Sequence, residues 1–465
     1  MANPKQEMPG RGRRPHGIAH HPYRTLAAAF AIWKVFLVAV VVGSCVGDAY
    51  DTSASLAVSR DSILTRFASW DAVYFVSIAR RGYRFEQEWA FGAGLPVALR
   101  GVIQVLVKFG LIDGGSGNSQ RWALLETAVG IAWANTAHFL SVLVLYRLGR
   151  LLWRSHPRGE LFSLVAGLLH VISPAGIFLS APYAESSCAL FTFGGYLLYA
   201  CSCHAAKPAA SDGFLVLSGL SFGLATVFRS NGILNGLPFA WEVATLLPRL
   251  VQRQKSPPGE KRKRERADTS RTATTVRRVL ALGIGGAAVG AGSLIPQAVA
   301  YRRFCAAPPS GAEAVSVPRP SWCDGYLPSI YAFVQAHYWN NGFLRYWTLS
   351  NLPLFLLAAP VLVVLAVSGV GMMRRAGTGS TGSEPGRLRG LIRAAAAAQV
   401  LLGLLVATNS HVQIISRISS GCPMWYFWLA ERVLEGDKWG RRAVVFMVVY
   451  AAVQAALFAL FLPPA

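Results

Sequence analysis

The segment 69–96, SWDAVYFVSIARRGYRFEQEWAFGAGLP, places the carboxylate of Asp71 among several aromatic side chains. An ionised carboxylate can act as a general base for an attacking hydroxyl, and aromatic faces pack against the C–H surfaces of sugars. Ser69 is a favourable cap for a surface helix that carries Asp71 in its first turn. The preceding apolar run, Leu26 to Val46, is long enough to cross a bilayer of roughly 30 Å. We therefore expect Asp71 to act on a sugar at a membrane surface.

Polar residues also interrupt apolar segments further along the chain. Glu185, in SPAGIFLSAPYAES, lies between two apolar segments, where a carboxylate facing lipid would be costly. Arg229 and Asn231, in FRSNGILNG, interrupt a stretch that would otherwise span twice. A buried Arg229 needs an anion or another acceptor, and a lipid phosphate, Glu185 or a backbone carbonyl would each serve. His411 and Arg417, in HVQIISR, carry donors suited to a phosphate, although headgroup contacts would also explain them.

The segment from Arg302 to Trp347 combines aromatic rings with polar partners. An aromatic belt at the membrane interface would explain the rings alone. The additional amide and charged side chains favour a surface that binds sugars. The candidate substrate-binding residues of this segment are Trp322, Gln335, Trp339, Asn340 and Arg345, and Trp70 and Glu86 join them from the segment around Asp71.

The composition predicts a membrane protein with many spanning helices. Of 465 residues, 53% are hydrophobic and 14% are charged, and apolar blocks recur to the C-terminus. The net charge of +23 does not indicate nucleic acid as a partner, because the basic residues gather between apolar blocks. We expect an all-α polytopic membrane protein with about 9–11 transmembrane helices.

The basic loops determine the expected topology, because loops rich in Lys and Arg stay in the cytoplasm. The apolar segment 92–112 contains Arg100 and Lys108, so we expect it to re-enter the membrane or to lie at its interface. The expected division is a basic cytoplasmic tail at 1–24 and one polytopic domain at 25–465, with disordered basic cytoplasmic loops at 249–278 and 372–393 and luminal loops with surface helices at 48–121 and 301–347.

Cys305 and Cys323 share one polar loop. Because that loop is expected in an oxidising compartment, we predict a disulfide between them. The sequence contains no Cys and His pairs at zinc-ligand spacing, no Asp-x-Asp motif and no glycine-rich phosphate loop. We therefore expect no metal, no cofactor and no nucleotide donor.

Taken together, these segments resemble the GPI mannosyltransferase 2 family, which consists of endoplasmic reticulum (ER) enzymes of the GT-C type. The resemblance implies transfer of mannose from dolichyl phosphate mannose to a monomannosylated GPI precursor, in an α-1,6 linkage, on the luminal side of the ER membrane. It also implies an accessory membrane subunit in some fungi. The matching segments occur in the family's order and are SWDAVYFVSIARRGY, SPAGIFLSAPYAES, FRSNG, the Trp322-Cys323 pair, IYAFVQAHYWNNGFLRYW, NLPLFLLAAP and HVQIISR.

Such a reaction needs a base for the acceptor hydroxyl and cations for the departing phosphate. We expect Asp71 to be the base. We expect Arg229, or His411 together with Arg417, to meet the phosphate charge. A phosphate is already a good leaving group, so the reaction does not demand a metal. The residues expected to hold the sugars are Trp70, Trp322 and Trp339.

Three other functions remain open at this point. A different GT-C transferase that uses another acceptor is the closest alternative. A transporter or scramblase would need ionisable residues near the middle of the membrane, whereas the acids here gather at one face. A scaffold without activity would not need the clustered acids and aromatic residues.

Overall fold

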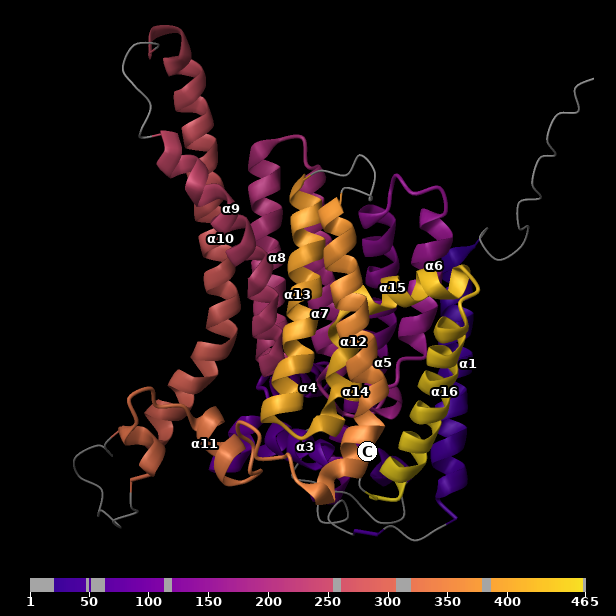
Figure 1. Ribbon diagram of the computed structural model, residues 1–465. Coiled ribbons are helices and arrows are strands. Elements are labelled where there is room, and N and C mark those ends of the chain that lie inside the picture. Colours follow the sequence, from indigo (N-terminus) through magenta and orange to yellow (C-terminus); the bar gives the residue numbers. More distant parts are fainter. Residues whose placement is uncertain are drawn as a thin grey trace, which may run out of the picture.

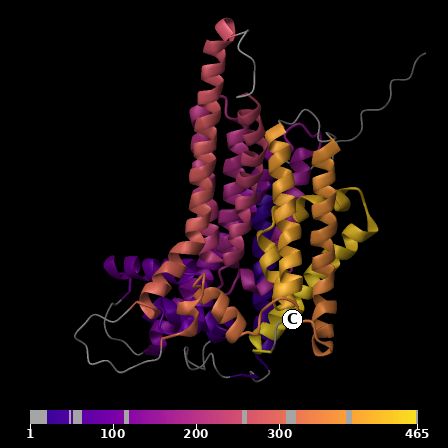
Figure 2. The ribbon, with the colours of Figure 1, turned by 60° about the vertical axis from the view of Figure 1, so that its left-hand side comes forward.

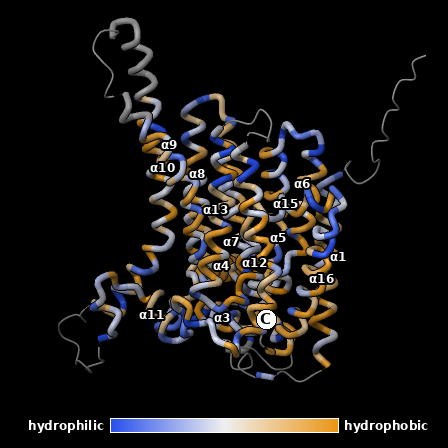
Figure 3. The backbone as a smooth tube through the Cα atoms, in the orientation of Figure 1, coloured by the Kyte–Doolittle hydropathy of each residue, from blue (hydrophilic) through white to orange (hydrophobic). Residues whose placement is uncertain are grey.

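The computed structural model describes residues 21–46, 50–51, 63–112, 119–253, 261–306, 319–378 and 386–462. Within these ranges every regular element is a helix, which confirms the predicted all-α class (Figure 1). Eight helices of the described part are long and apolar enough to cross a membrane. Hydrophobic residues follow these helices along the bundle (Figure 3). The eight are α1 (Pro22–Ser44), α5 (Ser119–Leu152), α7 (Glu185–His204), α8 (Pro208–Phe228), α10 (Lys261–Phe304), α12 (Leu352–Thr378), α13 (Gly386–Asn409) and α16 (Lys438–Ala459).

Three further helices of the bundle are shorter, namely α6 (Gly159–Val171), α9 (Leu237–Arg253) and α15 (Pro423–Leu434). Each is joined to an irregular stretch that contains at least one 3-10 turn. These stretches are 172–184 next to α6, 229–236 next to α9 and 410–422 next to α15. The prediction of about 9–11 transmembrane helices included these three apolar blocks, which do not fold as long helices.

The surface helices α3 (Asp71–Arg81) and α11 (Ile330–His337) lie at the end of the bundle where the C-terminus is found (Figures 1 and 2). The expected luminal segments 48–121 and 301–347 therefore meet at one end. The helix α4 (Gly94–Lys108) covers most of 92–112 and has 15 residues, fewer than a span needs. The side chain of Arg100 ties α4 to α3, because its Nε donates to the Ala79 carbonyl at 2.8 Å.

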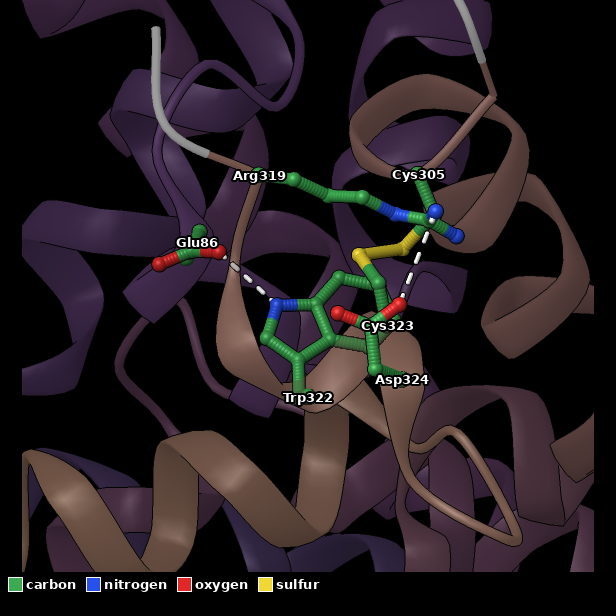
Figure 4. The surroundings of a disulfide bond; sticks show 6 residues. All are labelled: Glu86, Cys305, Arg319, Trp322, Cys323 and Asp324. Carbon is green, nitrogen blue, oxygen red and sulfur yellow. Dashed lines mark hydrogen bonds and ion pairs between the residues drawn. A yellow bond between two sulfur atoms is a disulfide. The ribbon is translucent and has the colours of Figure 1, made fainter.

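The predicted disulfide between Cys305 and Cys323 is present. It joins the end of α10 to the 3-10 turn η6 (Ser321–Asp324). Figure 4 shows Trp322 beside this disulfide with its indole directed toward Glu86, and Trp322 Nε1 donates to Glu86 Oε1 at 2.8 Å. Glu86 begins the 3-10 turn η2 (Glu86–Ala90). The disulfide and this hydrogen bond therefore connect the two expected luminal segments.

The basic segments 249–278 and 372–393 are helical wherever they are described, which differs from the expected disorder. α9 and α12 continue into these segments, and α10 and α13 begin within them. Lys and Arg have high helix propensity, so the helices extend beyond their apolar parts. Residues 254–260 and 379–385 lie outside the described part, as does most of the basic tail, residues 1–20.

Small residues bring α8 and α10 close together. A Cβ atom on Gly219 of α8 would lie 2.3 Å from the Cα atom of Gly285 in α10, so a larger residue would force the helices apart. Gly223 packs in the same way against the backbone of Ala288. Close contact between small residues is a common way for membrane helices to associate. It holds the C-terminal end of α8, where Arg229 follows, against a long neighbouring helix.

Candidate active site

A cavity of about 390 Å³ lies at the end of the bundle that carries α3 and α11. Charged groups, amides and aromatic rings from segments far apart in the sequence line it. The predicted site residues among them are Trp70, Asp71, Arg229, Gln335, Trp339, His411 and Arg417.

The helix α3 presents Asp71 at its first residue. The preceding Trp70 has a φ of 57°, a conformation that residues other than glycine rarely adopt. Trp70 Nε1 donates to the Leu462 carbonyl at 3.2 Å, and the Trp70 ring stacks on Phe461. The C-terminal segment therefore holds this strained residue in place, as is typical of functional sites. The expected cap by Ser69 is wrong, because no side-chain cap bond is present at the start of α3.

Two carboxylates and two guanidinium groups form one network beside the cavity. Arg417 Nη2 lies 2.7 Å from Asp71 Oδ2, and Arg417 Nε lies 2.9 Å from Glu185 Oε1. Arg229 Nη1 lies 2.7 Å from the same oxygen of Glu185. Of the anions that the sequence left open for Arg229, Glu185 is thus the one in contact. The Glu185 side chain is fully buried whereas that of Asp71 is 32% exposed, so Asp71 is the carboxylate that a substrate can reach.

Aromatic rings hold Arg417 in its position. The centroids of Phe178 and Tyr183 lie 4.5 Å and 4.9 Å from Arg417 Cζ. The Tyr183 hydroxyl donates to the Ser69 carbonyl at 3.0 Å, which ties these rings to the turn before Asp71. Cation–π contacts and ion pairs therefore fix the guanidinium before any substrate arrives.

Tyr74 lies one turn after Asp71, and its ring stacks on Phe91 with the centroids 4.6 Å apart. Burial, followed by the negative charge of Asp71, raises the pKa of the Tyr74 hydroxyl. The Tyr74 phenol is therefore neutral at physiological pH.

The three irregular stretches of the bundle converge on this site. The stretch 172–184 supplies Phe178 and Tyr183, the stretch 229–236 begins with Arg229, and the stretch 410–422 supplies His411 and Arg417. Irregular backbone at membrane depth is tolerated where it is buried in protein or lines a cavity. The breaks in these three segments are therefore explained by the cavity that they surround.

Three buried polar atoms at the site lack a hydrogen-bond partner within the described residues. They are Glu185 Oε2, Arg229 Nε and Asn341 Oδ1. Buried polar atoms are normally paired, so their concentration here is typical of a site that binds a polar ligand. The described ranges contain no group of three or more His, Cys, Asp or Glu side chains that could hold a metal ion.

Several predicted site residues lie elsewhere. Trp322 and Glu86 pair with each other beside the disulfide (Figure 4) and do not line the cavity. Asn231 borders a separate small pocket of about 30 Å³. Asn340 and Arg345 are exposed and do not line the cavity either.

Other cavity residues were not among the predicted site residues. Asn341 lines the cavity in place of its neighbour Asn340, and Tyr331 and Ser230 join it through a hydrogen bond of 2.8 Å between their hydroxyls. The ring of Phe178 lines it as well. These residues lie in the same segments as the predicted site residues. Membership of those segments was the one sequence feature that could have indicated them.

Comparison with known proteins identifies the family. Residues 39–378 match the family described as Mannosyltransferase (PIG-V). The chain is 53% identical to GPI mannosyltransferase 2 of Chaetomium globosum, over 99% of this chain and 100% of that protein. It is 41% identical to GPI mannosyltransferase 2 of Gibberella zeae, over 96% of this chain and 98% of that protein.

Among solved structures, the apo oligosaccharyltransferase of Archaeoglobus fulgidus is similar with a TM-score of 0.43 and 12% identity, over 93% of this chain and 56% of that chain. This chain therefore spans about half the length of that protein. The full-length matches of 53% and 41% identity are the ones that define the relationship. The chain belongs to the GPI mannosyltransferase 2 family and is a membrane-embedded mannosyltransferase of GPI biosynthesis.

Proposed function

We propose that this enzyme is of the GT-C type and transfers mannose from dolichyl phosphate mannose to the monomannosylated GPI precursor, forming an α-1,6 linkage. The observation that carries the proposal is the contact between Asp71 and Arg417 at the cavity. A partly exposed carboxylate beside a fixed cation supplies the base and the charge stabilisation that sugar transfer from a phosphate requires.

In the proposed reaction, a hydroxyl oxygen of the acceptor attacks the anomeric carbon of the donor mannose. Asp71 accepts the hydroxyl proton as the new C–O bond forms. The bond between the anomeric carbon and the phosphate oxygen breaks, and its electron pair stays with the phosphate. A single displacement of this kind inverts the anomeric centre. Asp71 therefore acts as the catalytic base, and the departing phosphate needs a nearby cation.

Arg229 is the cation better placed for the phosphate. Arg417 already contacts both carboxylates, and its side chain is 12% exposed. Arg229 contacts Glu185 through Nη1, lines the cavity and is 20% exposed. Because the two carboxylates balance the two guanidinium groups, an incoming phosphate competes with Glu185 for Arg229 and leaves the Asp71–Arg417 pair in place.

We also propose that the site faces the ER lumen, that the N-terminus is cytoplasmic, and that an accessory membrane subunit binds the enzyme. The membrane orientation is supported by the basic segments at the end opposite the cavity. The chain has no Asn-x-Ser/Thr acceptor sequence, so engineered glycosylation sites report the orientation without background. A site next to the fully exposed Tyr326 should be glycosylated and one within 254–260 should not. The opposite result would reverse the topology.

Depletion of the protein in cells tests acceptor and step together. Accumulation of a GPI precursor with one mannose is the expected result, and restoration of the two-mannose product by purified enzyme with dolichyl phosphate mannose would identify the donor. Accumulation of a different lipid-linked sugar would instead favour a GT-C transferase with another acceptor.

A further inference from the structure

The cavity has one charged wall and one neutral wall. The charged wall consists of Asp71, Arg229 and Arg417. The neutral wall comes from α11, the residues after it and positions 410–413, and it contains amides, hydroxyls, an imidazole and aromatic rings. The residues of this neutral wall are Tyr331, Gln335, Trp339, Asn341, Ser410, His411 and Gln413.

Two amides of the neutral wall are fixed against each other. Asn341 Nδ2 donates to Gln335 Oε1, and the Asn341 backbone N–H donates to the Gln335 carbonyl at 2.8 Å. This arrangement directs the donors of the Gln335 amide away from Asn341. It also leaves Asn341 Oδ1 as a buried acceptor without a partner among the described residues. An acceptor next to a donor is the pattern that complements sugar hydroxyls, which both donate and accept.

The orientation of His411 is also determined. Its Nε2 lies 2.8 Å from the Trp339 backbone carbonyl, which can only accept, so Nε2 carries the proton. In the neutral ring Nδ1 is then an acceptor. The ring stacks on Tyr346 with centroids 4.7 Å apart, and the Tyr346 hydroxyl donates to Gln413 at 3.1 Å. The Nδ1 lone pair of this tautomer is an acceptor that suits a sugar hydroxyl.

We propose that the neutral wall binds the terminal mannose of the acceptor glycolipid through Gln335, Asn341 and His411, and that it thereby determines acceptor specificity. The inference rests on the proposed function and divides its site in two. The seven residues of the neutral wall include no Lys or Arg, so we assign the donor phosphate to Arg229. Amides built to pair with hydroxyls discriminate strongly against analogues that lack them, because an unmatched polar group stays unpaired.

Steady-state transfer by the full-length enzyme tests this division, with dolichyl phosphate mannose as donor and a synthetic monomannosylated GPI glycolipid as acceptor. Gln335→Leu and Asn341→Leu should each raise the acceptor KM about threefold to tenfold, the range for a lost neutral hydrogen bond. The donor KM should not change. His411→Phe should do the same, because phenylalanine keeps a ring against Tyr346 but has no Nδ1 acceptor.

Asn340→Gly is the matched control. It removes an exposed amide next to Asn341 at a position where φ is 50°, which glycine adopts without strain. Its acceptor KM should equal that of the wild type. Gln335→Glu preserves the shape of the side chain and removes its amide donors, so it replaces Gln335→Leu if that variant unfolds.

A rise in the donor KM with an unchanged acceptor KM in these variants would overturn the division. So would a fall in kcat with both KM values unchanged. Failure of the wild-type enzyme to use this donor and acceptor would contradict the proposed function. That result would be distinct from any difference between the variants.

Discussion

The two ends of the bundle each contain a buried ion-pair network, and the networks differ in how completely they are paired. Opposite the cavity, Glu242 of α9 receives Arg278 Nε at 2.8 Å and Arg387 Nε at 3.3 Å on Oε1. Its Oε2 accepts from the Tyr199 hydroxyl and from Arg278 Nη2. At the cavity, Glu185 uses Oε1 for both arginines and leaves Oε2 without a partner in the described part.

The difference indicates different roles. The paired network joins α7, α9, α10 and α13 through their side chains, and within the described residues none of its buried polar atoms lacks a partner. The network at the cavity joins α3, α7 and two irregular stretches, and it exposes Asp71 and Arg229 to the cavity. The first network holds helices together, and the second holds the groups to which we assign the reaction under the proposed function.

The largest effect on transfer is expected for Asp71→Asn. Loss of a general base should lower the transfer rate at least about a hundredfold. Folding should survive, because Arg417 keeps its contact with Glu185. Transfer at equal protein level is the measurement. Asp324→Asn is the control, since Asp324 is 67% exposed and pairs with Arg319 at 3.5 Å away from the cavity (Figure 4). Near wild-type transfer by Asp71→Asn would show that the base is another residue.

Arg229→Lys should have the next largest effect. Lysine keeps the charge but lacks the planar fork that binds a phosphate through two hydrogen bonds. The donor KM should rise about tenfold, as expected when a hydrogen bond to a charged group is weakened. The same replacement at Arg277, which pairs with Asp212 at the opposite end, should leave the donor KM unchanged. Equal donor KM values for Arg229→Lys and the wild type would place the phosphate elsewhere.

A smaller effect is expected when Cys305 and Cys323 are both replaced by serine. The disulfide lies outside the cavity but holds η6, and with it the hydrogen bond from Trp322 to Glu86. Transfer should fall by less than about tenfold, which corresponds to about 1.4 kcal/mol. The measurement is specific activity of purified enzyme with and without reductant. If reductant lowered the activity of the serine variant as strongly as that of the wild type, the disulfide would not be the group responsible.

The smallest effect on transfer is expected for Glu242→Gln, although its effect on stability is large. Removing this carboxylate leaves the buried Arg278 with Asp212 at 3.5 Å as its remaining acidic partner. The stability loss should be about 3 kcal/mol, the lower end for a broken buried pair. Thermal unfolding of purified protein measures it, and transfer per folded molecule should not change. Glu185→Gln should impair transfer, because the Glu185 carboxylate contacts both Arg229 and Arg417 at the cavity.

Sequence reasoning predicted the features that depend on local composition. The apolar blocks form helices, and the two cysteines of one loop form a disulfide. Glu185 was one of the partners predicted for Arg229, and it is the one in contact. The position of Asp71 at a helix start was also predicted, but the contact that fixes the residue before it was not. Trp70 is held by Leu462, which is 392 residues away in the sequence, and no local pattern encodes such a contact.

The positions of Trp322 and Asn341 show the same limit. Trp322 lies in a segment rich in aromatic and polar residues, which predicted a sugar-binding surface. The disulfide of the neighbouring Cys323 instead holds Trp322 in a buried cluster. Of two adjacent asparagines, the positive φ of Asn340 places it at the surface and Asn341 at the cavity. Which of two neighbours faces a site depends on a backbone angle that the tertiary structure determines.

The wide spacing of the ion-pair residues along the chain has a consequence for biosynthesis. Asp71 emerges from the ribosome first, Glu185 and Arg229 follow, and Arg417 emerges only after α13 has been made. Glu185 and Arg229 can pair with each other during this interval, whereas Asp71 has no partner in the network until Arg417 has been made. A nascent chain that stops short of α14 (Ile415–Ile418) would carry most of its spans and still have no complete network. Under the proposed function, catalytic competence is therefore acquired late in membrane insertion, and partly made chains cannot act on the donor prematurely.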